Sequence, residues 1–119
     1  MRKKFLNKNL ANDIEVKISN LKLFNFLTIT NDTFLFRDTK IPEDMANFIR
    51  ITLDKSNKEL VIHGFGISNK YKGTGKQVIN AILNQLDNSW VIKLENNLNP
   101  DFWQHLNQKY YPDFTFISI

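Results

Sequence analysis

The segment from residue 59 to residue 94 constrains the fold more than any other part of the chain. Its first part, Glu59 to Ile67, is typical of a strand, and the continuous apolar run Leu60-Val61-Ile62 indicates burial on both faces. Gly73-Thr74-Gly75 interrupts the chain, and a helix follows whose single apolar stripe contains Val78, Ile79, Ile82, Leu83 and Leu86. Trp90 to Leu94 predicts a second strand. This order predicts two neighbouring parallel strands joined by a right-handed crossover.

Shorter elements precede this unit. Leu21 to Thr30 and Thr33 to Arg37 are rich in Phe, Leu, Ile and Thr, and Asn31-Asp32 between them tolerate a positive φ, so we expect a β-hairpin. Glu15 to Ile18 alternates polar and apolar residues and predicts another short strand. The polar and basic residues 1 to 12 are expected to be frayed.

Two proline-containing segments predict the starts of helices. Ile41-Pro42-Glu43-Asp44 places a proline and two acids in a first turn, and we expect this short helix to present Met45, Phe48 and Ile49 on one face. Asn99-Pro100-Asp101 begins another helix, whose apolar residues are Phe102, Trp103, Leu106 and Tyr110. Pro112 ends it, and Phe114 to Ile119 predicts a last strand. The expected fold is therefore α/β (α+β), a single domain over residues 1–119 with one mixed β-sheet and flanking helices.

Composition excludes several functional classes. The chain has no cysteine, which excludes a disulfide framework, a thiolate zinc site and a cysteine nucleophile. A net charge of +4 is too small to indicate nucleic-acid binding by itself. No apolar run approaches the ~20 residues of a membrane span, and Asn7-Lys8-Asn9 stands where a signal peptide needs apolar residues. We expect a cytoplasmic protein with no membrane partner. The two histidines have no neighbouring acids, so no metal site is predicted.

The stretch from Leu60 to Leu86 carries the strongest chemical signal. It has three lysines and no Asp or Glu, and its segment Lys72-Gly73-Thr74-Gly75-Lys76-Gln77 lies between a strand and the start of a helix. Backbone N–H groups at a helix start can bind an anion, and glycine lets a ligand oxygen approach the main chain. We interpret this loop as a phosphate or pyrophosphate site. In the alternative, Thr74 and Gln77 form a capping box and the glycines serve only the turn.

Two familiar phosphate loops are excluded by spacing. A Walker A loop needs glycine where Lys70 stands and Ser or Thr where Gln77 stands. The dinucleotide fingerprint needs glycine where Val78 stands. A different family of phosphate loops must therefore be considered.

The loop resembles that of the GNAT superfamily of N-acyltransferases, whose pyrophosphate motif runs Gln/Arg-x-x-Gly-x-Gly/Ala. Lys72 stands where Gln or Arg is expected, Gly73 takes the second place, and Gly75 matches the central glycine. Further along, that family often shows an Asn, an Ala, a Phe-Tyr pair and a Leu-Gly pair, and the matching residues here are Asn96, Asn99, Phe102-Trp103 and Leu106-Asn107. The resemblance covers Glu59 to Ile119, about half of the chain.

This resemblance implies an activity and a set of site residues. The strands Glu59 to Ile67 and Trp90 to Leu94 would splay apart, and the thioester arm of acetyl-CoA would lie between them. The implied reaction is acetyl transfer from acetyl-CoA, a co-substrate, to an amine of an unknown small-molecule or protein acceptor, with no metal. The implied cofactor-binding residues are Phe65, Ile67, Lys72, Gly73, Thr74, Gly75, Lys76, Gln77 and Asn96.

His63 and Glu59 are the candidate catalytic residues, because both lie on the strand that would carry a general base. A neutral imidazole, with a usual pKa of about 6.5, suits this task. In the alternative, His63 is hydrogen-bonded within the sheet and Glu59 is a solvated strand end.

Three residues depart from the family pattern. Gln77 replaces the last Gly or Ala of the loop, and Asn107 replaces a glycine. Trp103 replaces the Tyr that often protonates the departing thiolate, and an indole N–H cannot act as that acid. Gln77 and Trp103 favour an alternative: a non-catalytic GNAT-fold binding or inhibitor module, encoded by a mobile element, that acts on a protein or nucleic acid. A further alternative is an RNA-binding module built on the Phe-rich hairpin, whose edge is also compatible with a homodimer.

Overall fold

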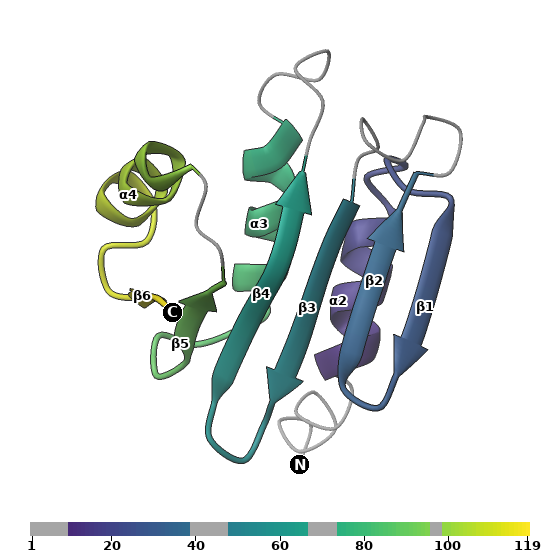
Figure 1. Cartoon of the computed structure of the whole chain (residues 1–119), viewed down its shortest axis with the longest axis horizontal. Helices are drawn as coiled ribbons and strands as arrows, with labels where there is room; N and C mark the ends of the chain where they lie inside the picture. The colour runs from purple at the N-terminus through teal and green to yellow at the C-terminus, as the bar shows by residue number, and fades with distance from the viewer. Residues whose placement is uncertain (1–9, 39–47, 67–73, 96–98) are drawn as a thin grey trace.

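The computed structural model describes residues 10–38, 48–66, 74–95 and 99–119. These residues form one mixed sheet whose strands follow the chain order: β1 (Phe26–Thr30), β2 (Thr33–Arg37), β3 (Phe48–Asp54), β4 (Glu59–Gly66), β5 (Val91–Leu94) and β6 (Thr115–Ser118). The helices described are α2 (Leu10–Ser19), α3 (Thr74–Leu83) and α4 (Pro100–Lys109). The first four strands are antiparallel, and β4, β5 and β6 are parallel. The predicted fold class, an α+β fold with a single mixed sheet, is confirmed (Figure 1).

Several local predictions are confirmed because short-range signals decide them. β1 and β2 form the expected hairpin, and Asn31 in its turn has a φ of 55°. The crossover β4–α3–β5 joins neighbouring parallel strands as expected. α4 begins at Pro100 and ends before Pro112.

Two predicted elements are wrong, and the expectation of a frayed segment over residues 1 to 12 fails at residues 10–12, which open α2. Glu15 to Ile18 is part of α2, because Leu10, Ile14 and Ile18 recur every four residues and are all buried. This helical stripe outweighs the four-residue alternation that suggested a strand. The second error concerns Phe48 and Ile49, which open β3, where hydrogen bonding to β2 and β4 takes the place of a helix. Residues 41–47 of that expected helix lie outside the described residues.

One face of the sheet carries the core. Across β2, β3 and β4, Phe34 lies opposite Ile51 and Ile51 opposite Ile62, and all three side chains are buried. Helices α2 and α3 lie behind the sheet in the view of Figure 1. α4 joins the same core through Trp103, whose ring centroid lies 6.2 Å from that of Phe116.

The opposite face, which we call the open face, carries half-buried and exposed side chains. Thr33 lies opposite Thr52, and Thr52 lies opposite Val61, so these residues share the open face. Val61 is only half-buried, which corrects the expectation that the Leu60-Val61-Ile62 run is buried on both faces.

Asn107, on α4, ties that helix to the chain that follows. Its side-chain N–H group donates hydrogen bonds to the backbone carbonyls of Tyr111 (2.7 Å) and Phe114 (3.2 Å). Capping of the chain after a helix by an amide is a role that glycine cannot perform. Asn107 therefore has a structural role of its own at the end of α4.

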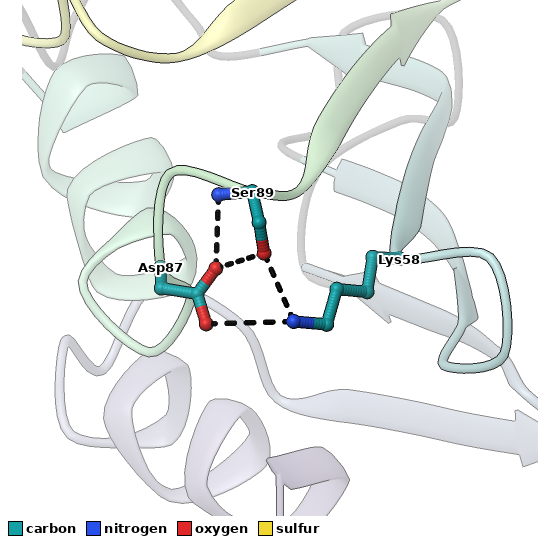
Figure 2. A network of polar contacts seen from close by, with 3 residues as sticks. All are labelled: Lys58, Asp87 and Ser89. Carbon is teal, nitrogen blue, oxygen red and sulfur yellow. Dashed lines mark hydrogen bonds and ion pairs between the residues drawn. The ribbon is translucent and has the colours of Figure 1, made fainter.

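A polar network joins two turns at one end of the sheet. Lys58, in the β3–β4 turn, places its ammonium 3.0 Å from the Ser89 hydroxyl and 3.9 Å from Asp87, and the Ser89 hydroxyl also bonds Asp87 (Figure 2). The Ser89 backbone N–H donates to Asp87 at 2.9 Å. The pKa of Asp87 is lowered, chiefly by the Ser89 side chain and then by its backbone N–H.

This network predicts an acid-sensitive contribution to stability. A carboxyl whose folded pKa lies below its unfolded value stabilises the fold at higher pH, and the contribution is lost as the pH falls through the folded pKa. Asp87→Asn should therefore be less stable than the wild type at about pH 7, and the difference should be smaller at about pH 2. Urea unfolding at both pH values measures this. Asp113→Asn is the charge-matched control, and an equal pH dependence in both variants would contradict the assignment.

Candidate functional site

Four polar side chains form a continuous hydrogen-bonded chain across the open face. The Thr33 Oγ1 atom lies 2.9 Å from Thr52 Oγ1, and Thr52 Oγ1 lies 2.6 Å from His63 Nε2. The other ring nitrogen of His63, Nδ1, lies 3.0 Å from Glu95 Oε1. We call these residues the polar chain. Strands β2, β3 and β4 and the residue that follows β5 supply its members.

Strand pairing and one irregularity position the members of the polar chain. Thr33 and Thr52 are direct partners across β2 and β3. Arg50 pairs with Gly64 while Ile51 pairs with Ile62, so His63 is the extra residue of a β-bulge in β4. Bulges re-aim a side chain, and this one lets the imidazole reach Thr52 on the neighbouring strand.

Glu95 directly follows the last described pair between β4 and β5. Its backbone N–H donates to the Ile62 carbonyl at 3.0 Å, directly after the last β4–β5 pair, Ile62 with Leu94. β4 continues to Gly66, and no described strand pairs with it on the β5 side beyond Ile62. His63 therefore directly follows the last described β4–β5 pair, with its carboxylate partner beside it.

The direction of the hydrogen bonds follows from the chemistry of the groups. An ionised Glu95 can only accept, so a neutral His63 carries its proton on Nδ1 and donates it to Glu95. His63 Nε2 then accepts, and the Thr52 hydroxyl donates to it. Thr33 in turn donates to Thr52. The His63 side chain is 22% exposed and the Glu95 side chain is 40% exposed, so solvent reaches the His63–Glu95 end of the polar chain.

The structure separates the two predicted catalytic residues. His63 is hydrogen-bonded within the sheet, as the alternative expectation had it, and it also contacts a carboxylate. Glu59 pairs with Lys93 at 2.8 Å, at the start of β4 and four residues from His63. Sequence reasoning missed Thr52 and Glu95, because neither is near His63 in the sequence and the bulge that brings His63 to Thr52 leaves no mark in the residue pattern.

The predicted cofactor residues are only partly described. Ile67, Lys72, Gly73 and Asn96 lie outside the described residues. α3 begins at Thr74, has no acidic residue in its first turn, and exposes Gln77.

Phe65 and Gly75 pack against one another at the start of α3. A Cβ atom on Gly75 would lie 3.3 Å from the Phe65 ring, and the Phe65 ring centroid lies 6.0 Å from that of Phe102 and 5.9 Å from that of Trp103. Gly75 therefore lets α3 approach β4 closely, in addition to any role toward a ligand.

Lys76 contacts the aromatic ring of Tyr110, the residue that follows α4. Its ammonium lies 3.6 Å from the centroid of the Tyr110 ring. The pKa of Tyr110 is lowered, chiefly through the Lys76 side chain. The next residue behaves oppositely, because burial raises the pKa of Tyr111.

These neighbours predict opposite titration behaviour for two adjacent tyrosines. Tyr110 should ionise below, and Tyr111 above, the usual value of about 10. Lys76→Met should raise the pKa of Tyr110 and leave that of Tyr111 unchanged, because it removes a cation from the first ring only. Ring-labelled NMR over a pH titration reads both groups. A Tyr110 pKa that does not respond to Lys76→Met would contradict the contact.

A separate hollow lies at the other side of the molecule. It has a volume of about 210 Å³ and is lined by Ser19, Phe24, Asn25, Phe26, Leu27 and Phe36. It lies between the end of α2 and the hairpin of β1 and β2, and β3 separates that hairpin from β4. No member of the polar chain lines it, so it is distinct from the candidate site.

Comparisons with known proteins do not identify a function for this chain. No protein-family model matches the chain, and neither the curated proteins nor the solved structures give a significant match. Among the residues that the structure describes, no cluster of three or more His, Cys, Asp or Glu could hold a metal ion. Within those same residues, no helix has the length and apolar character needed to cross a membrane.

Proposed function

We propose that this chain is a small N-acyltransferase that transfers an acetyl group from acetyl-CoA to an amine. One observation carries the proposal: a histidine with a carboxylate partner lies where β4 continues and its parallel neighbour β5 ends. A base is thereby combined with a strand edge suited to an extended ligand.

The end of β4 supports binding of an extended, amide-containing arm. Peptide-like ligands bind sheets by continuing the backbone hydrogen bonding of an edge. The pantetheine arm of acetyl-CoA contains two amide groups and could extend the pairing that stops at Ile62, along Phe65 at the end of β4. This would bring the thioester toward His63.

The start of α3 supports binding of the diphosphate. The first turn of this helix carries no acid, and its N–H groups and dipole favour an anion. The diphosphate would be bound by the residues that open α3, together with the two that precede them: Lys72, Gly73, Thr74, Gly75, Lys76 and Gln77. Because Lys76 lies over Tyr110, we assign it a long-range electrostatic role toward the diphosphate rather than a direct one.

The reaction needs a proton acceptor for the amine. A bond forms between the amine nitrogen and the acetyl carbon, the carbon–sulfur bond breaks, and CoA leaves as a thiolate. The amine proton passes through the Thr52 hydroxyl to the His63 imidazole, while Glu95 stabilises the resulting imidazolium. Trp103 is buried and is a donor only, so CoA would take its proton from His63 or from water.

Calorimetric titration with acetyl-CoA and with free CoA tests the proposal, and Gln77→Glu sharpens the test. Gln77 is exposed in the first turn of α3, where a carboxylate favours the helix but repels a diphosphate. We expect micromolar binding in the wild type, weakened about tenfold or more by Gln77→Glu. Thermal stability should be unchanged or higher in that variant.

Gln104→Glu, an exposed change on α4, is the matched control and should bind as the wild type does. Absence of binding at millimolar acetyl-CoA would refute the proposal. Binding without acetyl transfer to any amine would instead favour a non-catalytic binding module, the second candidate. Trp103 supports that candidate. It is 7% exposed and packs among Phe65, Phe102 and Phe116, and it takes the position at which the GNAT superfamily often has a catalytic tyrosine.

A further inference from the structure

The hydrogen bond between Thr52 and His63 places the Thr52 hydroxyl where the imidazole can take its proton. Thr52 Oγ1 lies 2.6 Å from Nε2, and Glu95 accepts the proton on Nδ1. Both ring nitrogens are therefore engaged by the protein. An external amine would have to displace Thr52 before it could give a proton to Nε2, whereas the Thr52 hydroxyl is already in position to do so.

This arrangement has the three parts of an activated hydroxyl nucleophile. Such sites place a hydroxyl within about 2.6–3.2 Å of a base, and a third group orients the base. Here these parts are Thr52, His63 and Glu95, and both contacts fall within that range. The Thr33 hydroxyl, 2.9 Å from Thr52 Oγ1, adds a donor that stabilises negative charge on that oxygen.

A cationic side chain lies next to Thr52 on the open face. Arg50 precedes Thr52 by two residues on β3, is exposed, and pairs with Gly64 beside the bulge. Residues two apart on a strand share a face. A guanidinium at this position can reach the oxygen of an acyl group on Thr52 and stabilise the charge that develops there.

We propose that Thr52 is a nucleophile that accepts an acyl group and forms an acyl-threonine ester. Thr52 Oγ1 attacks the acyl carbonyl carbon and its proton passes to His63 Nε2. The bond from that carbon to the leaving group breaks, and the leaving thiolate or phenolate takes the proton from the imidazolium. An amine or water then attacks the ester carbon and gives its proton to His63 Nε2. The bond from that carbon to Thr52 Oγ1 breaks, and Oγ1 takes the proton from the imidazolium. The step needs no oxidant or metal. With acetyl-CoA as donor it rests on the proposed function, but with an activated ester it does not.

The test uses p-nitrophenyl acetate, an activated acetyl ester that does not require recognition of CoA. We expect a burst of nitrophenolate and an added acetyl group that peptide mass spectrometry maps to Thr52. Thr52→Val, which keeps the β-branched shape, should lose the burst by about a hundredfold or more, and Thr52→Ser should keep it. Glu95→Gln should slow acylation without removing the hydroxyl. Thr28→Val, on the same face of β1, is the control for the loss of a surface hydroxyl.

The outcomes separate this inference from the proposed function. An acetyl group mapped only to His63 or to lysines, or Thr52→Val acylated as fast as the wild type, would overturn the role of Thr52. Transfer from acetyl-CoA to an amine that is unchanged in Thr52→Val would also overturn it, while the acyltransferase proposal would stand. Acylation of Thr52 by the ester, with no binding of acetyl-CoA, would support the nucleophile and refute the acyltransferase.

Discussion

His63→Gln should lower kcat for acetyl transfer by about a hundredfold to ten-thousandfold, the range that a positioned general base contributes. Glutamine keeps one donor and one acceptor, so it can still bond Glu95 and Thr52 and preserve the open face. It cannot accept a proton at neutral pH. The variant should therefore bind acetyl-CoA as the wild type does and fail at the chemical step.

Steady-state rates at saturating acetyl-CoA, with a panel of amines, measure this effect. His105→Gln on the exposed side of α4 is the control, because it makes the same substitution outside the site. A kcat for His63→Gln within about twofold of the wild type would remove His63 from the chemistry.

Ile62→Ala should destabilise the fold by about 2–5 kcal/mol, the usual cost of removing a buried branched side chain. Ile62 is 3% exposed and lies between Ile51 of β3 and Leu94 of β5, at the last described β4–β5 pair. The cavity would form at the centre of the sheet, where backbone hydrogen bonds on both sides restrict collapse. Against a total stability of about 5–15 kcal/mol, this loss is severe.

Urea unfolding of Ile62→Ala and Val61→Ala compares the two faces of β4. Val61 is the adjacent residue on the open face and only half-buried, so its truncation should cost less. Equal costs for the two variants would contradict the assignment of a single buried face.

The elements that sequence reasoning predicted are those with strong local signals. The β1–β2 hairpin follows from its turn residues, α3 from its apolar stripe, and α4 from Asn99-Pro100. α2 and the start of β3 were mispredicted for opposite reasons. In α2 a four-residue alternation concealed a helical period, and in β3 pairing with two neighbouring strands decides the conformation of Phe48 and Ile49.

The candidate site was only half predictable because register joins its members. His63 could be named from its residue type and its place on a predicted strand. Thr52 and Glu95 could not, since their approach depends on the β3–β4 register, on the bulge at His63 and on where β5 ends. The periodicity of a short segment does not predict long-range pairing of this kind.

Gly75 shows how one residue can satisfy two interpretations. The sequence places it where glycine would admit a diphosphate oxygen, and the structure shows that a Cβ there would press on the Phe65 ring at 3.3 Å. A large substitution at Gly75 would therefore disturb packing as well as binding. Gln77, which is exposed, is the better position for testing the ligand.

The central claim is that acetyl-CoA binds where β4 continues beyond β5, beside His63. An amide NMR titration of the labelled protein with acetyl-CoA tests it most directly, because it reports each backbone N–H separately. We predict saturable shifts at Gly64, Phe65, Gly75 and Glu95, with none in the hollow lined by Phe24 and Phe26. Shifts confined to that hollow, or no shifts at millimolar acetyl-CoA, would contradict the account.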